Sequence, residues 1–174
     1  GKNLLYEIHG EEKRTVIAFD QIPQLVKNAT IAAEDAEFYR HSGINFRGIL
    51  RAVISDIRGK RLAEGGSSIT QQLIKNAYLS PERTLSRKIR EIILAIELEK
   101  KYSKNEILNF YLNQIPYGLN SYGIEAAALS YFNKPAKELN LAEAAYLAAL
   151  PKAPSYYSPY GARGGELKSR ANHI

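Results

Sequence analysis

Apolar residues recur at helical spacing along most of the chain that follows residue 20. In residues 46–58, FRGILRAVISDIR, six apolar residues fall at positions i, i+3, i+4, i+7, i+8 and i+11, on one face of a helix. They are Phe46, Ile49, Leu50, Val53, Ile54 and Ile57. Further helices are predicted from Pro23 to the Ser42-Gly43 pair and from Thr84 to Tyr102. In the helix from Thr84 to Tyr102, the residues expected to face the core are Leu85, Ile89, Ile92, Ile93 and Ile96.

Capping patterns indicate where more helices begin. Ser67 or Ser68 follows a flexible Gly65-Gly66 pair and suits an N-cap, while SKNE (103–106) and NLAE (140–143) are capping-box patterns. Two extended runs around Gly10 predict a short β-hairpin in residues 1–20. The fold is therefore predicted as one mainly α domain over residues 1–174, with a division into two lobes near Gly65-Gly66.

Basic residues flank the apolar face of the 46–58 helix. Arg47 and Arg51 lie off the apolar stripe, which is typical of a helix that rests on a membrane surface. A helix that packs on the core and exposes a basic face has the same periodicity, so the pattern leaves both interpretations open.

Composition narrows the classes of function. The 174 residues are 45% hydrophobic, as in globular proteins, and 24 Lys and Arg against 18 Asp and Glu give a net charge of +6. This charge favours an anionic partner, whether nucleic acid, a lipid headgroup or a phosphorylated substrate. The absence of cysteine excludes thiolate chemistry, and the three histidines lack zinc-ligand spacing, so no metal site is predicted. No apolar run is long enough to span a bilayer, and the absence of methionine suggests a piece of a longer protein.

Two clusters of charged residues are candidates for chemistry. The stretch IAAEDAEFYRHSG (31–43) holds Glu34, Asp35 and Glu37, which form either a solvated helix face or the edge of an active site. Arg87, Lys88 and Glu91 lie one helical turn apart, either as an ordinary surface ion pair or as a functional group of charges.

Five motifs in order give these clusters a context: EDAEFYRHSG, EGGSSITQQLIKN, RKIRE, KNEILNFYLNQIPYG and GIEAAALSYF. Together they resemble the peptidoglycan glycosyltransferase domain, glycosyltransferase family 51, of class A penicillin-binding proteins and monofunctional transglycosylases. The resemblance runs from about Leu4 to Pro159. It implies a lysozyme-like helical fold with a large lobe and a small membrane-facing "jaw", here about residues 44–65.

The resemblance also implies an activity and a location. Such domains polymerise lipid II into glycan strands and release undecaprenyl diphosphate at the outer, periplasmic face of the bacterial cytoplasmic membrane; they are also targets of moenomycin. The implied partners are lipid II, the growing strand and the membrane surface, with no nucleic acid. The resemblance implies an N-terminal membrane anchor in the parent chain and leaves open whether a C-terminal transpeptidase domain follows. No cofactor is expected to be required, although Mg²⁺ or Mn²⁺ at the diphosphate is compatible with the chemistry.

Roles are carried over motif by motif. Glu34 corresponds to the general base and Glu91 to a second carboxylate of the catalytic cleft. Substrate-binding positions correspond to Asp35, Ser67, Gln71, Gln72, Lys75, Arg83, Arg87 and Lys88. The jaw positions expected to contact the membrane are Phe46, Arg47, Ile49, Leu50, Arg51, Val53, Ile54 and Ile57. Lys104, Tyr111 and Asn113 match a motif that is chiefly structural.

Inverting glycosyl transfer explains why these residue types belong together. A carboxylate must take the proton of the acceptor hydroxyl, whereas a diphosphate leaving group needs cations and no general acid. Two alternatives stay open at this point. A lysozyme-like or lytic enzyme would also use a glutamate but has no need of the cations, and a non-catalytic basic helical module would group its cations on one face.

Overall fold

The computed structural model describes residues 13–48, 66–79, 84–152 and 164–174, and in these the protein is mainly helical, as predicted. The α-helices are α1 (Gln24–Glu34), α3 (Ile69–Tyr78), α4 (Leu85–Lys101), α5 (Lys104–Gln114), α6 (Ile124–Phe132), α7 (Leu141–Ala149) and α8 (Gly164–Ala171). Short 3-10 turns are η1 (Phe19–Gln21), η2 (Phe38–Arg40) and η3 (Ala136–Glu138). A small sheet holds β1 (Lys13–Arg14), β2 (Pro116–Gly118) and β3 (Ser121–Tyr122).

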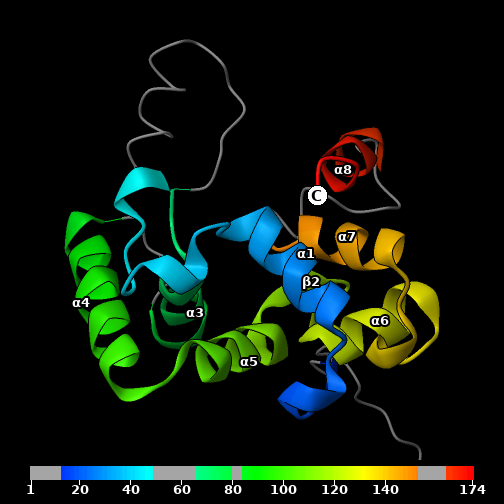
Figure 1. The fold of residues 1–174 in the computed structure, drawn as a ribbon, viewed down its shortest axis with the longest axis horizontal. Helices are drawn as coiled ribbons and strands as arrows, with labels where there is room; N and C mark the ends of the chain where they lie inside the picture. Colours follow the sequence, from blue (N-terminus) through cyan, green and yellow to red (C-terminus); the bar gives the residue numbers. More distant parts are fainter. Residues whose placement is uncertain (1–12, 49–65, 80–83, 153–163) are drawn as a thin grey trace, which may run out of the picture.

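The helices form two neighbouring groups. α3 packs against both α4 and α5 in one group, while α7 packs against α1 and α8 in the other (Figure 1). Between them, α5 leads from α4 toward the small sheet and α6 (Figure 1). The end of α1 and the beginning of α3 lie where the two groups meet, and this position brings their polar side chains together.

The sheet joins segments that are far apart in sequence. β3 is central; it pairs in parallel with β1 and antiparallel with β2. The hairpin predicted for residues 1–20 lies mostly outside the described residues. Of its described part, residues 13–20, only Lys13 and Arg14 form a strand, which pairs with β3, and η1 begins at Phe19. Asn113 supports this arrangement, because its side chain accepts from the amide of Ile17 at 2.9 Å and donates to its carbonyl at 3.0 Å.

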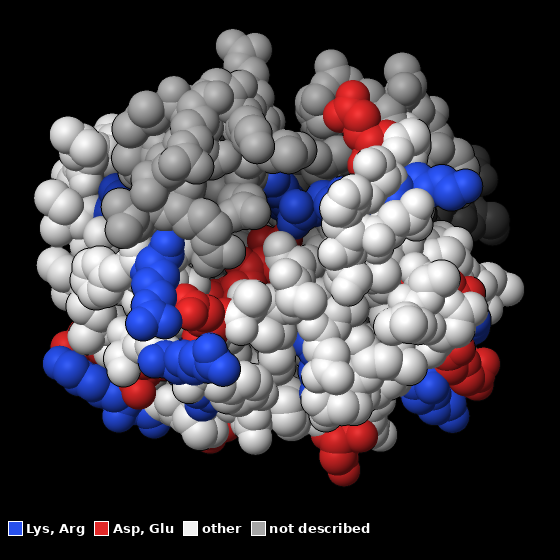
Figure 2. Space-filling model, turned by 45° about the horizontal axis from the view of Figure 1, so that its top comes forward, with Lys and Arg blue, Asp and Glu red and all other residues white. Residues whose placement is uncertain are grey.

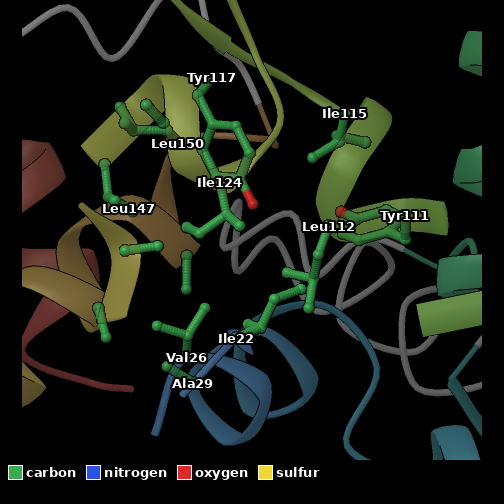
Figure 3. Packing of buried hydrophobic residues seen from close by; sticks show 14 of the residues in the cluster. Ile22, Val26, Ala29, Tyr111, Leu112, Ile115, Tyr117, Ile124, Leu147 and Leu150 are labelled. Carbon is green, nitrogen blue, oxygen red and sulfur yellow. The ribbon is translucent and has the colours of Figure 1, made fainter. Parts of the chain in front are cut away.

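The main apolar core lies between α1, α5, α6 and α7. Ile22, Val26 and Ala29 belong to the same buried cluster as Leu147 and Leu150, from the end of α7 (Figure 3). α5 and the following strand supply Tyr111, Leu112, Ile115 and Tyr117, and α6 supplies Ile124. Burial of this apolar set is the main favourable term in holding the helices together.

Caps confirm three predicted helix starts. Ser68, rather than Ser67, caps α3, and its hydroxyl accepts from the amide of Gln71. Ser103 and Asn140 complete capping boxes with glutamates three residues later, at the starts of α5 and α7. Asn133 ends α6 in the left-handed region with φ 54° and ψ 37°, a conformation that asparagine tolerates.

Two sequence predictions were wrong in detail. The helix expected to continue to Ser42-Gly43 ends at Glu34, because Asp35 leaves helical geometry at φ −159°. In α4, three of the five residues expected to face inward are exposed, Leu85 at 85%, Ile89 at 58% and Ile93 at 54%, whereas Ile92 and Ile96 are half-buried. The inner face of α4 instead carries polar residues that contact α3 and α5.

The predicted jaw lies largely outside the described residues. A helix begins at Phe46 and is described as far as Gly48, with Phe46 74% exposed. The other jaw positions, residues 49–65, lie beyond the description, as does Arg83. In the part of the chain that is described, no helix is both long and apolar enough to cross a membrane.

Candidate active site

Glu34 is the last residue of α1, and its carboxylate is held from two sides. Nε2 of Gln72, from α3, donates to one oxygen at 2.8 Å, and Nη2 of Arg170, from α8, donates to the other at 3.0 Å. Only 5% of the Glu34 side chain is exposed. Three helices therefore fix the orientation of this carboxylate.

Burial governs the acidity of Glu34. Loss of hydration raises the pKa of its carboxyl above the ordinary value of 4.5, and this effect exceeds the opposing ones. The hydrogen bond from Gln72 and the charge of Arg170 lower the pKa, as does the charge of Lys152 to a lesser degree. A buried carboxylate whose pKa is raised toward neutrality is a better proton acceptor than an exposed one.

Asp35 is the next residue, but its carboxylate binds the protein framework. It shares a hydrogen bond of 2.8 Å with Nε2 of His41 and accepts from Asn45 at 3.0 Å and from the amide of Ile69 at 3.2 Å. Its side chain is fully buried. Asp35 thus ties the end of α1 to the following turn and to the first residue of α3.

Glu37, the third carboxylate of this stretch, lies at the surface. Its only described partner is Arg47 at 3.4 Å, and the Arg47 side chain is 84% exposed. An exposed ion pair of this kind contributes little to stability.

A second charged cluster lies on the inner face of α4. Lys88 forms an ion pair with Glu91 and donates to the hydroxyl of Ser67 at 3.0 Å. Arg87 lies 3.4 Å from the other oxygen of Glu91, which is 1% exposed. The interpretation of this trio as an ordinary surface pair is wrong, because Glu91 is buried and holds both cations.

Gln72 connects the two clusters. Its amide nitrogen donates to Glu34 and, at 3.4 Å, to the carbonyl of Ser67, and its amide oxygen accepts from the Tyr111 hydroxyl at 3.1 Å. Ser67 in turn accepts from Lys88. A continuous chain of contacts therefore runs from the buried base to the cations of α4.

The remaining substrate-binding candidates are more dispersed. Gln71 is fully buried, and its side chain accepts from the amide of Ser68 as part of the α3 cap, so its described contact is structural. Lys75 is exposed further along α3. Lys104, from the motif expected to be structural, donates to Glu99 at 2.7 Å, and the same Glu99 oxygen accepts from Thr70 at 2.5 Å.

Glu34 opens into a cavity of about 230 Å³. Its lining includes Asp35, Asn45, Lys152, Arg170 and His173. Figure 2 shows acidic side chains in the middle of one face of the molecule, with basic side chains near them. The cavity places a buried carboxylate beside positive charge.

Sequence reasoning missed Lys152 and Arg170. Arg170 lies 136 residues from Glu34 along the chain, and no local spacing connects them. Within the described residues, no group of three His, Cys, Asp or Glu side chains is placed to hold a metal ion.

Comparisons with known proteins identify the family of the chain. The profile of the transglycosylase family matches residues 1–174. The chain is 51% identical over 159 residues to penicillin-binding protein 1A of Aquifex aeolicus and 50% identical over 148 residues to penicillin-binding protein 1F of Bacillus subtilis. These matches cover 91% and 85% of this chain but 22% and 21% of the relatives, so the chain spans about a fifth of their length.

A third relative, penicillin-binding protein 1A of Neisseria lactamica, is 48% identical over 152 residues, which are 87% of this chain and 19% of that protein. The family profile spans all the motifs that surround the buried carboxylate. The chain therefore belongs to the transglycosylase family.

Proposed function

We propose that this domain is a peptidoglycan glycosyltransferase that polymerises lipid II by inverting transfer. The observation that carries the proposal is the buried carboxylate of Glu34, which is joined through Gln72 and Ser67 to the cations of α4. Membership of the transglycosylase family supports the same reaction class.

Glu34 acts as the general base in the proposed reaction. Its carboxylate takes the proton of the acceptor sugar hydroxyl as that oxygen forms a bond to the anomeric carbon of the donor. The bond from this carbon to the diphosphate breaks on the opposite face, and undecaprenyl diphosphate leaves with the electron pair. The raised pKa of Glu34 makes it a stronger proton acceptor than an exposed carboxylate.

Cations stabilise the leaving group. Lys88 and Arg87 carry the positive charge at the far end of the chain of contacts that starts at Glu34, and Lys75 and Arg83 belong to the same proposed donor side. Glu91 keeps Lys88 and Arg87 in place on α4, which is the role we assign to it in preference to that of a second acid. Fixed positive charge in a partly desolvated cleft stabilises a developing anion without reorganisation at the moment of reaction.

The proposed chemistry requires no resident cofactor, because the protein supplies cations for the diphosphate. A Mg²⁺ or Mn²⁺ ion bound to the substrate diphosphate would add to this charge. Rates measured with EDTA and with each added metal give the size of that contribution.

The lipid substrate places the reaction at a membrane surface. Exposed Phe46 and Arg47 support a membrane-facing jaw, with an apolar ring for the lipid and a cation for the headgroups. In the proposed setting the domain lies on the outer face of the cytoplasmic membrane. We propose that the parent chain carries an N-terminal membrane anchor; because this chain spans about a fifth of its relatives' length, a longer parent chain has room for a further domain such as a transpeptidase.

Polymerisation of lipid II tests the proposal. Wild-type protein is expected to convert lipid II to glycan polymer, and Glu34→Gln to reduce the rate by about 10²- to 10⁴-fold. Glu37→Gln is the matched control, because it removes a surface carboxylate three residues away. Cleavage of finished peptidoglycan without polymer formation would instead identify a lytic enzyme, and substantial turnover by Glu34→Gln would contradict the assignment of the base.

A further inference from the structure

Arg170 makes three contacts with the ends of two other helices. Besides the Glu34 carboxylate at 3.0 Å, its Nη2 approaches the carbonyl of Ala33 at 3.3 Å, and its Nε donates to the carbonyl of Ala149 at 3.3 Å. Ala33 is in the last turn of α1, and Ala149 is the last residue of α7. One guanidinium therefore connects α8 to the C-terminal ends of both helices.

The carbonyls at these helix ends are suitable partners for a cation. Carbonyls in the last turn of a helix lack intrahelical donors and carry partial negative charge, so an arginine there is favourable. The planar guanidinium has several donors at fixed angles, which lets it bind two carbonyls and a carboxylate together. The arrangement restricts the Glu34 side chain as well as its backbone.

We propose that Arg170 is a positioning residue for the general base: it aims one oxygen of Glu34 and places a fixed positive charge against it, while Gln72 holds the other oxygen. The inference rests on the proposed function, since it assigns to α8 a part in activating the acceptor hydroxyl. It is independent of the five sequence motifs, because Arg170 lies outside all of them.

Several polar and charged groups surround the Glu34 carboxylate, and Arg170 is one of them. Gln72 donates from α3, and Lys152 adds positive charge. The phenols of Tyr111 on α5 and Tyr117 on β2 face the same carboxylate, and burial first and the Glu34 charge second raise their pKa values, so both stay neutral. Asp35 and His173 line the same cavity. Among these groups, Arg170 is the cation that the structure places in direct contact with Glu34.

The test compares pH profiles of lipid II polymerisation by wild-type protein and by Arg170→Gln. The variant is expected to lose about 10- to 100-fold in kcat at neutral pH through misalignment of the base, with the KM for lipid II unchanged. The acid limb of its profile should move to higher pH, because the charge that favours ionised Glu34 is gone. Arg170→Lys keeps that charge and is expected to return the acid limb toward the wild-type position.

Two further variants separate the possible outcomes. Lys168→Ala removes an exposed cation on the same helix and should match the wild type in kcat and in the position of the acid limb. Circular dichroism shows whether Arg170→Gln folds. If it does not, Arg170→Met replaces it, because methionine retains the packing of the arginine stem, and the same two quantities, kcat and the pH of the acid limb, are measured. A fall in kcat without movement of the acid limb, or an unchanged rate, would overturn the positioning role.

The proposed function fails in a different way. If wild-type protein forms no polymer from lipid II, or if Glu34→Gln remains active, the assignment of the reaction or of the base is wrong. If wild type polymerises lipid II and Glu34→Gln does not, while Arg170→Gln matches wild type at every pH, only the inference about Arg170 is wrong.

Discussion

Glu34 and Asp35 are neighbours in the chain, yet their carboxylates have different surroundings. Glu34 faces a cavity and accepts from two side chains, whereas Asp35 is enclosed by a histidine, an asparagine and a backbone amide. The chain direction changes between them because α1 ends at Glu34. This change of direction lets one carboxylate serve the proposed chemistry and the other the framework.

The acid side of the pH–rate profile is predicted to report Glu34. The base acts only when it is ionised, and burial raises its pKa, so the rate should fall with decreasing pH earlier than for an exposed carboxyl. Gln72→Leu removes the largest of the effects that lower this pKa and should move the acid limb to still higher pH. Initial rates of polymerisation as a function of pH measure this, and an unmoved limb would contradict the role of Gln72.

Asp35→Asn is predicted to destabilise the fold. An amide can no longer accept at both oxygens, so one buried donor loses its partner, at a cost of about 1–3 kcal/mol in unfolding free energy. Urea unfolding followed by circular dichroism measures the loss. Glu37→Gln is the comparison, with little expected change, and equal stability of the two variants would argue against the framework role of Asp35.

At the residue scale, the sequence motifs predicted Glu34 and the group on α4 but left the roles of their neighbours unresolved. Spacing places Asp35 beside Glu34 without showing that its oxygens face His41 and Ile69. Arg170 was not predicted at all, since its approach to Glu34 depends on how α8 packs on α7, which no local pattern encodes.

At the scale of elements, caps were predictable and the orientation of α4 was not. A cap depends on side chains within four residues, so SKNE and NLAE are sufficient to place the starts of α5 and α7. Periodicity shows that α4 has one apolar and one charged face, and burial normally favours the apolar one. Here the charged face is turned inward because Lys88 binds Ser67, just before α3, and Glu99 accepts from Thr70 on α3. Ile89 and Ile93 therefore remain exposed.

The docking of α8 gives a prediction at this scale. Leu167 is fully buried in the core and anchors α8 beside α7, so Leu167→Ala should weaken this packing by about 2–5 kcal/mol. Arg170 would then leave Glu34 for part of the time, and the polymerisation rate should fall together with protection of α8 in hydrogen exchange. Lys168→Ala provides the control on the exposed side of the helix; retained protection in Leu167→Ala would contradict the prediction.

At the scale of the whole molecule, binding to a membrane is predicted to depend on the surface at Phe46. Phe46→Ser combined with Arg47→Glu removes an exposed aromatic ring and reverses a charge, so binding to anionic liposomes should weaken. Cosedimentation measures the bound fraction. Leu141→Ser changes a similarly exposed apolar residue at the start of α7 and should leave binding unchanged. Equal binding by all forms would contradict the location of the jaw surface.

The contact between Asp35 and the first amide of α3 has a consequence for the movement of a glycan strand. Because this contact joins α1 to α3, and Gln72 and Arg170 hold both oxygens of the carboxylate, Glu34 stands at a fixed point of the framework. Under the proposed reaction, each elongation cycle must therefore return a new hydroxyl to the same place. The polymer has to advance by one repeat past a stationary base, so the step length of synthesis is set by the sugar chain and not by a stroke of the enzyme.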